Sequence, residues 1–258
     1  MQIIINIIKV NAAGFLAGAL TTMQVALLGT VFGSVIGLLI GVVKTVPVKK
    51  TDLLVKRVFF KIINAILTVY IEVFRGTPMI IQAVVIYYGS AEWFNIHMSP
   101  LFAGIFVVSI NTGAYMSEIV RGGINSIDNG QFEAAHAIGM SHGQTMFNII
   151  LPQTIKNILP ATSNEFVINI KDTAVLNVIS LSELFFKTKG IYGKNFYYYQ
   201  TALIACAIYL VLTFTTTRLL RLVEKKLKGS DSYTVLGSRE KRREDMKNPK
   251  DAKKPEVE

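Results

Sequence analysis

The chain contains 258 residues, of which 51% are apolar and 17% are charged, and its mean hydropathy is +0.44. Soluble domains carry about 25% charged residues and do not collect their apolar residues into long runs. The formal net charge of +10 comes from basic residues in short loops and in the C-terminal tail, which favours a membrane topology over nucleic-acid binding. The composition therefore predicts an all-α integral membrane protein.

Five apolar runs have the length of membrane-spanning helices, which need about 20 residues to cross a bilayer. They lie at residues 14–43, 58–88, 100–119, 158–186 and 197–222. Polar residues interrupt the second run near 72–78 and the fourth near 171–173. The sequence predicts about five spans, two of them broken.

The bias of lysine and arginine sets the expected orientation of these spans. Basic residues are dense between the first two spans and again from Arg218 onward, whereas the segment 90–100 has none. We therefore expect the C-terminus and the loop 121–152 in the cytoplasm, and the N-terminus outside the cell membrane. The expected organisation is an extracytoplasmic segment 1–13, a transmembrane domain 14–223 and a basic tail 224–258. With almost no apolar content, the tail is expected to be disordered.

The first run carries a glycine every four residues, at Gly29, Gly33, Gly37 and Gly41. Residues at this spacing share one face of a helix. Small side chains on one face let a second helix approach closely, which is how helices associate in lipid. Chance enrichment is the alternative, because glycine is common in membrane helices. The stripe predicts close packing of the first span against another helix.

The loop between the third and fourth spans has the pattern of two short helices. The first is expected over residues 131–139, and Gly139 can end it by adopting a positive φ. The second is expected over residues 141–150, with Ser141 as its N-cap and an end before Pro152. Together they form a hairpin at the cytoplasmic surface.

An apolar ridge along the second helix suggests what this hairpin does. The ridge consists of Phe147, Ile150 and Leu151. It could dock on a partner protein, or it could lie in the membrane interface with no partner.

The residue spacing in this loop is specific. It reads Glu-Ala-Ala, three residues, Gly, nine residues and Ile-x-Leu-Pro, filled here by Glu133, Ala134, Ala135, Gly139, Ile149, Leu151 and Pro152. This spacing resembles the loop signature of permeases of type I ATP-binding-cassette (ABC) importers. The resemblance implies that the loop forms coupling helices seated in a groove of a cytoplasmic ATPase dimer. The ATPase-docking residues would then be Glu133, Ala134, Ala135, Gly139, Leu151 and Pro152.

Three further stretches, 72–78, 111–124 and 170–173, resemble the polar amino acid subfamily of these permeases, which serves histidine, glutamate, glutamine and arginine. The likeness covers most of the chain and implies a type I importer permease fold with about five transmembrane helices. It also implies a second permease subunit, an extracytoplasmic solute-binding protein and an amino-acid substrate. The sequence departs from the subfamily at Ala174, where serine is frequent, and at His136, where a basic or other long residue is usual.

Polar and ionisable residues inside a membrane span are costly, and they usually mark a pathway. At about 1.5 Å per residue, Asn111 lies about 17 Å from the outer end of the third span, and Asp172 about 17 Å from the inner end of the fourth. An amide and a carboxylate at one depth suit the ammonium group of an amino acid. The resemblance likewise associates both positions with substrate binding. A structural ion pair between Lys171 and Asp172 is the alternative.

Glu72 and Arg75 stand one helical turn apart, beside the point where Gly76 and Pro78 break the second span and free backbone groups to face a cavity. Arg75 could hold a substrate carboxylate in bidentate geometry. The alternative is an internal ion pair between Glu72 and Arg75 that stabilises the kink. Glu118 completes the substrate-binding candidates, although its place near the cytoplasmic boundary also suits a gate.

Catalytic chemistry finds no support in the sequence. No glycine-rich Walker pattern is present, so the transport ATPase is expected to be a separate subunit. No Ser/His/Asp set, metal-ligand cluster or cofactor loop stands out, so we expect neither an enzyme nor a metal or cofactor. Two alternatives stay open: an autonomous secondary transporter or channel, and a permease for another solute such as a metal chelate or an osmolyte.

Overall fold

The computed structural model describes residues 1–48 and 50–228. Its helices, in chain order, are α1 (Gln2–Lys44), α2 (Leu54–Gly76), α3 (Met79–Phe94), α4 (Pro100–Asn125), α5 (Asn129–Ala137), α6 (His142–Thr145), α7 (Leu151–Asp172), α8 (Leu184–Asn195) and α9 (Tyr198–Lys228). A π-helical turn, Met146–Ile150, joins α6 to α7, and a 3-10 segment, Thr173–Ile179, follows α7. The described residues contain no strand, which agrees with the all-α prediction.

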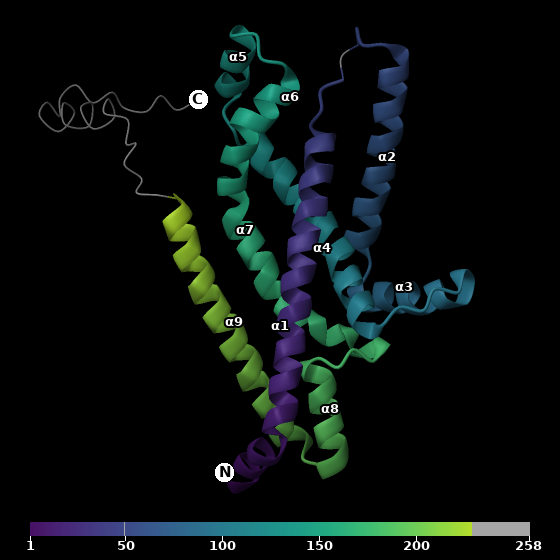
Figure 1. Ribbon diagram of the computed structural model, residues 1–258, viewed down its shortest axis with the longest axis vertical. Coiled ribbons are helices and arrows are strands. Elements are labelled where there is room, and N and C mark those ends of the chain that lie inside the picture. The colour runs from purple at the N-terminus through teal and green to yellow at the C-terminus, as the bar shows by residue number, and fades with distance from the viewer. Residues whose placement is uncertain (49, 229–258) are drawn as a thin grey trace, which may run out of the picture.

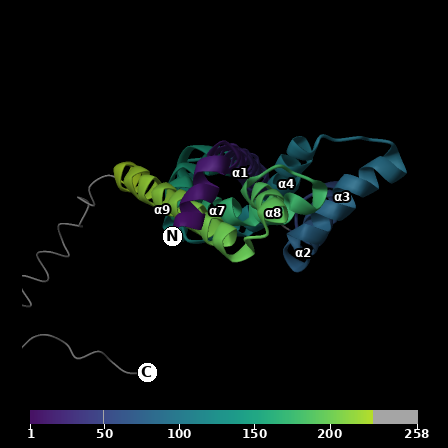
Figure 2. The ribbon, with the colours of Figure 1, turned by 90° about the horizontal axis from the view of Figure 1, so that it is seen from below.

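The helices form an elongated and flattened subunit. Helices α5 and α6 lie at one end, which we call the hairpin end, and the N-terminus lies at the other (Figure 1). Seen from below, α9 lies at one side and α2 and α3 at the other (Figure 2). Helix α1 runs through the middle and contacts α4, α7, α8 and α9. This long helix is therefore the spine of the subunit.

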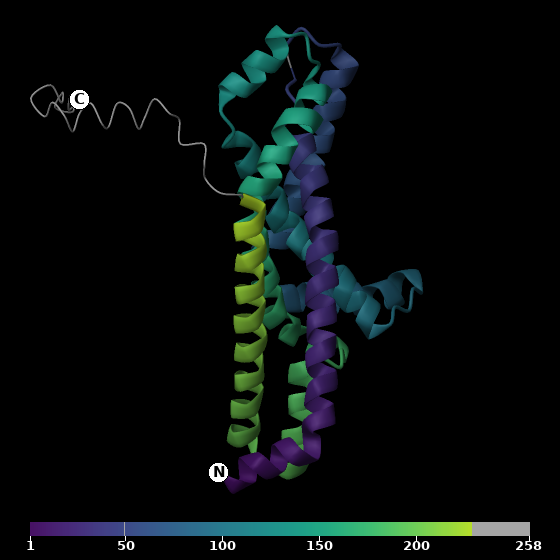
Figure 3. The same cartoon turned by 60° about the vertical axis from the view of Figure 1, so that its left-hand side comes forward.

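Within the described part of the chain, three helices are long and apolar enough to cross a membrane: α1, α4 and α9. Helix α1 begins at Gln2 rather than at residue 14, so the predicted segment 1–13 is helical, and it bends away from the main axis (Figure 3). Helix α9 continues to Lys228, so residues 224–228 of the predicted tail are helical. The remainder of that tail, 229–258, lies outside the described residues.

The interrupted second run forms two helices. Helix α2 ends at Gly76, and α3 leaves it at a steep angle and projects from the side of the subunit (Figures 1 and 3). Thr77 between them is extended, with φ −121° and ψ 147°, because the residue before a proline is disfavoured in the helical region. The predicted interruption of the run 58–88 near residues 72–78 is therefore confirmed, and the two halves run in different directions.

The fourth run, 158–186, also divides, into the end of α7, the 3-10 segment and the start of α8. Glu183 caps α8, because its carboxylate accepts hydrogen bonds from the N–H groups of Phe185 and Phe186 at 2.7 and 2.6 Å. The hydroxyl of Tyr209 on α9 donates to the same carboxylate at 3.0 Å. This fully buried carboxylate ties α8 to α9. The end of α7 at Asp172 confirms the predicted break of the run 158–186 near residues 171–173.

The glycine stripe of α1 lies against α4, which confirms the predicted close packing. A Cβ atom added to Gly33 would lie 2.6 Å from the Cβ of Thr112, and one added to Gly37 would lie 2.7 Å from the main chain of Met116. Real Cβ atoms do not approach other atoms so closely, so glycine is what permits this separation of the helices.

Candidate functional site

The hairpin made by α5 and α6 is fixed by its local sequence. Asp128 caps α5 by accepting a hydrogen bond from the Gly130 N–H at 2.6 Å. Gly139 follows with a φ of +82°, as predicted. Ser141 caps α6 in a capping box, in which the Gln144 N–H donates to the Ser141 hydroxyl and the Ser141 N–H donates to Gln144 Oε1 at 2.8 Å. The start of each helix is therefore set by a side-chain cap, and the turn between the helices is set by Gly139.

The second helix of the hairpin does not stop before Pro152. It passes through the π-helical turn Met146–Ile150 into α7, and Pro152 lies in the first turn of α7. Proline has no N–H to donate, and the wider register of the π-turn just before it allows the helix to continue without that bond. The expected end of the helix is therefore wrong, and the hairpin is continuous with α7.

The apolar ridge predicted on the hairpin is wrong for two of its three residues. Ile150 is fully buried and Leu151 is 7% exposed, and both belong to the apolar cluster at the hairpin end. Phe147, by contrast, is 69% exposed, and Ile138 is 78% exposed. The apolar surface that the hairpin offers therefore consists of Phe147 and Ile138.

The six predicted docking residues divide by exposure. Exposed are Glu133, Ala134, Gly139 and Pro152. Ala135 is 1% exposed and Leu151 is 7% exposed. The side chains of Ala135 and Leu151 therefore pack the hairpin onto its own subunit.

A cavity of about 430 Å³ lies under the hairpin, and its lining includes His136 and His142. Burial, followed by the positive charges of His136 and Lys56, lowers the pKa of His142 below its usual range. The neutral imidazole of His142 is favoured as a result. Among the described residues, no three His, Cys, Asp or Glu side chains lie close enough to share a metal ion.

Amide side chains hold the break between α2 and α3. Gln82 Nε2 lies 2.9 Å from each of the Phe74 carbonyl, the Thr77 carbonyl and the Thr77 hydroxyl. Asn111 Nδ2, from α4, donates to Gln82 Oε1 at 2.9 Å and to the Phe74 carbonyl at 3.2 Å. These contacts satisfy carbonyls that the interrupted helix leaves without partners. We call these four residues the amide clasp.

Glu72 and Arg75 do not form the ion pair considered from the sequence. Both side chains are exposed, and Glu72 has no hydrogen bond or ion pair with any other described residue. The Arg75 guanidinium lies over the ring of Tyr115 on α4, 5.4 Å from its centroid. Arg75 forms no hydrogen bond or ion pair with another described residue, so its N–H groups stay available to an anion.

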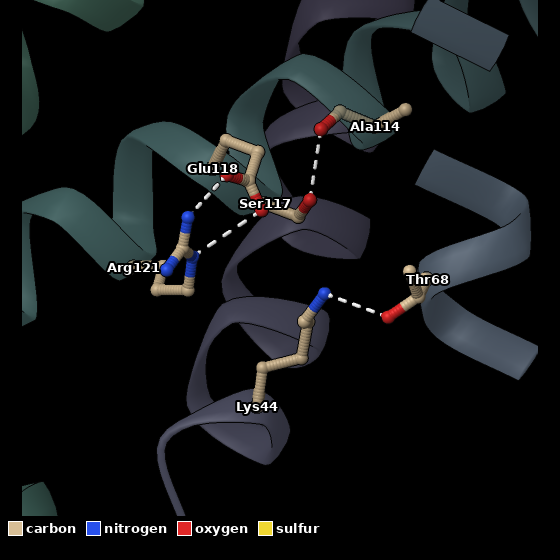
Figure 4. A network of polar contacts seen from close by, with 6 residues as sticks. All are labelled: Lys44, Thr68, Ala114, Ser117, Glu118 and Arg121. Carbon is tan, nitrogen blue, oxygen red and sulfur yellow. Dashed lines mark hydrogen bonds and ion pairs between the residues drawn. The ribbon is translucent and has the colours of Figure 1, made fainter. Parts of the chain in front are cut away.

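Glu118 pairs with Arg121 one turn along α4, with 2.6 Å between Oε2 and Nη2 (Figure 4). Nearby, Lys44 at the end of α1 donates to the Thr68 hydroxyl on α2 at 3.2 Å (Figure 4). Lys44 and Arg75 also act electrostatically on the Glu118 carboxylate. One carboxylate therefore faces more than one cation, an arrangement with positive charge to spare for a carboxylate of a ligand.

Asn111 and Asp172 lie on neighbouring helices but do not meet. Asn169 ties the three inner helices together, since its amide donates to Thr112 on α4 at 2.9 Å and to Thr30 on α1 at 2.8 Å. Asn111 is next to Thr112 on α4, but its side chain donates to the amide clasp. Asp172 is exposed and has no hydrogen bond or ion pair, to Lys171 or otherwise, within the described part of the chain. One subunit alone does not bring the two side chains together.

Reasoning from the sequence misses Glu165 on α7. It is 8% exposed and has no hydrogen bond or ion pair with any other described residue. A carboxylate inside an apolar run was the available signal. Gln82 and Asn169 are missed as well, because an uncharged amide in a helix gives no clear sign of the helix it will meet.

A family model described as "Binding-protein-dependent transport system inner membrane component" matches residues 33–229. The chain belongs to this family. The matched region contains the hairpin, the amide clasp and all of α9 as described. The chain is thus a membrane permease of a transport system, and its helical architecture is the predicted type I importer permease fold.

Curated relatives of this permease include permeases of arginine and glutamine transport systems. It is 35% identical to the arginine transport system permease ArtQ of Bacillus subtilis over 216 residues, which cover 84% of this chain and 93% of ArtQ. It is 34% identical to the glutamine transport system permease GlnP of Escherichia coli K12 over 212 residues, which cover 82% of this chain and 91% of GlnP.

Solved structures resemble the permease over most of its length. An amino acid ABC transporter crystallised with histidines has a TM-score of 0.74 at 35% identity, covering 85% of this permease and 96% of that chain. An inward-facing form of the MetNI methionine ABC transporter has a TM-score of 0.68 at 18% identity, covering 83% and 95%. The second likeness concerns the fold alone.

Proposed function

We propose that this permease carries polar amino acids into the cytoplasm by alternating access, energised by a separate ATPase dimer docked on residues 131–152. The observation that carries the proposal is the complete coupling signature, placed on a capped hairpin at one end of the subunit. Glu133 and Ala134 are exposed there, with Phe147 and Ile138 as apolar contacts. The names of the arginine and glutamine relatives support the substrate class.

The partners follow from where the charges lie. Charged side chains on membrane helices, such as Glu72, Arg75 and Asp172, are exposed on the single subunit, and exposure to lipid would be costly. A second permease subunit, identical or paralogous, would enclose them around an aqueous pathway. The lysine and arginine bias supports an N-terminus outside the cell membrane and a C-terminus inside. A solute-binding protein would then deliver substrate to the outer loops.

The substrate site would be completed between the two subunits. Arg75, with the surplus positive charge around Glu118, suits the carboxylate of an amino acid. Asp172 and Glu72 suit its ammonium group. Asn111 would contribute its amide when the clasp opens. No metal or cofactor is required by this scheme.

Substrate-stimulated ATP hydrolysis in liposomes tests the proposal. The permease would be co-reconstituted with candidate ATPase and solute-binding subunits, and each amino acid would be supplied in turn. We expect one or two amino acids to stimulate hydrolysis, and Glu133→Arg to lower this stimulation at least about tenfold. Lys156→Glu is the matched control, because it reverses an exposed charge near the same end of the molecule but outside the coupling signature.

Two results would count against the proposal. Equal loss in Glu133→Arg and Lys156→Glu would mean that the signature has no special role in docking. Solute uptake without any ATPase would replace the importer with an autonomous secondary carrier.

A further inference from the structure

A groove runs between α7 and α9 toward the hairpin end. It consists of two adjoining cavities of about 250 and 280 Å³, which share Val167, Thr217 and Arg221 in their walls. The two helices run along each other on the side of the subunit opposite α2 and α3 (Figures 1 and 2). The groove therefore lies on the side of the subunit away from α2, the helix that carries Glu72 and Arg75.

The charge of this groove is predominantly positive. Lys171, Arg218 and Arg221 line it, with Glu224 as the acidic residue at its end. None of the three cations forms an ion pair with another described residue. Arg218 lies over the ring of Phe214, 4.8 Å from the centroid, which holds its guanidinium in place and leaves its N–H groups open. The groove thus offers several donors to an anion, and the carboxylates nearby are Glu224 in its wall and Asp172 beside Lys171.

The arginines lie at the level of lipid headgroups. Helix α9 begins with exposed tyrosines at Tyr198 and Tyr199, residues that favour a membrane interface. Arg218 follows Tyr198 by about 30 Å along the helix at 1.5 Å per residue, which is the thickness of a bilayer core. Between these ends, Leu210 and Phe214 border the groove and are 66% and 55% exposed.

We propose that the α7–α9 groove binds an anionic phospholipid from the leaflet at the hairpin end. Arg218 and Arg221 hold its phosphate, since guanidinium groups pair with phosphate oxygens in bidentate fashion. Lys171 reaches the phosphate from the deeper end of the groove, as long basic side chains do at membrane interfaces. An acyl chain lies along Leu210 and Phe214. Basic pockets between membrane helices bind such headgroups. The residues that line this groove are different from the proposed substrate contacts, although Lys171 is next to Asp172 in the chain.

Native mass spectrometry of the full-length permease, in the assembly in which it purifies, tests the site. Phosphatidylglycerol and phosphatidylcholine would be titrated separately into delipidated protein. We expect tighter binding of phosphatidylglycerol, and a drop of roughly tenfold in its affinity in the double variant Arg218→Gln/Arg221→Gln. The control is Lys225→Gln/Lys226→Gln, which removes the same charge from exposed positions of the same helix outside the groove, and it should keep the preference.

Three outcomes would overturn the site. Equal loss in both double variants would indicate general attraction of the basic helix end to anionic lipid. No loss in either variant would exclude the groove. The Tm of the protein would also be measured with inorganic phosphate and with phosphatidylglycerol. An equal rise in Tm with both would identify a free-anion site, because phosphate has no acyl chain.

A cross-linking experiment separates lipid from a second protein subunit. Thr217→Cys would be introduced together with Cys206→Ser, since Cys206 is the single native cysteine and is exposed on α9. We expect no disulfide-linked permease dimer after oxidation in the membrane. A dimer formed through position 217 would place a second copy in the groove and would refute the lipid site.

Discussion

Helices α1 and α4 meet in a different way from α2 and α3. Along the first pair, the glycines of α1 let the backbones of two apolar helices lie close together. Between the second pair, the helix is broken, and the amide clasp satisfies the exposed carbonyls. The first contact depends on shape and the second on hydrogen bonding, which are the two means available where lipid gives helices no hydrophobic reason to associate. A rigid seam therefore lies beside a junction that a few hydrogen bonds can close or release.

The largest effect is expected at the glycine seam. Gly37→Ala should lower the free energy of unfolding by about 3 kcal/mol, because the added methyl group meets the main chain of α4 and forces the helices apart. The loss would be measured as a lower Tm of the purified protein. Gly14→Ala on the same helix is the control, because nothing lies within 4 Å of a Cβ at that position. Equal Tm values would show that the seam is not tightly packed.

The amide clasp should be the next most sensitive element. Gln82→Leu removes the donor that serves the carbonyls of Phe74 and Thr77, and unsatisfied polar groups of this kind cost about 2 kcal/mol. We expect a lower Tm and faster hydrogen exchange in residues 74–82. Gln153→Leu loses only a bond to its own helix, from Nε2 to the Ile149 carbonyl at 2.9 Å, and should change little. Exchange that rises equally in both variants would argue against a clasp.

Asn111 allows the clasp to be separated from the substrate site. If it only joins α4 to the break, Asn111→Ala should cost about 1 kcal/mol of stability and leave the apparent KM for substrate unchanged. If the amide also binds substrate, as proposed, KM should rise by more than in the Gln82→Leu variant, although that variant is expected to lose more stability. Transport assays and thermal unfolding on the same preparations would distinguish these results.

The smallest effect on stability is expected at Arg75. Its contact with Tyr115 should contribute about 0.5–1 kcal/mol, so Arg75→Met should lower the Tm only slightly. Uptake should fall far more than stability, because the guanidinium is proposed to hold substrate. Tyr115→Leu is the comparison, since it removes the ring and keeps the charge. If Arg75→Met and Tyr115→Leu lower uptake equally at equal loss of Tm, Arg75 has only a structural role.

The glycine seam and the hairpin caps could be predicted from the sequence because both are local patterns. Gly29 to Gly41 recur at the helical period, and Ser141 and Gly139 signal helix ends by their own chemistry. The coupling spacing likewise predicted the family that the comparison found. Such features need no knowledge of which helix lies opposite.

The directions of the broken spans could not be predicted in the same way. Pro78 predicts a break in the helix. The angle between α2 and α3 depends on the hydrogen bonds of Gln82 and Asn111, which are far apart in the sequence. Burial of Ile150 and Leu151 reversed the predicted ridge, since periodicity cannot tell a face against the core from a face against a partner. A depth for Asp172 could be predicted from the sequence, but the side chains around it depend on tertiary packing.

The uninterrupted passage from α6 through the π-turn into α7 has a mechanical consequence. Helix α7 has 22 residues, so it reaches about 33 Å from the hairpin at 1.5 Å per residue. Its far part holds Asn169, which grips α1 and α4, and ends at Asp172. Because Asn169 holds this far part against α1 and α4, we expect a tilt of the hairpin to be passed along α7 to these two helices. Helix α7 thus connects the proposed docking hairpin to Asp172, the candidate substrate carboxylate.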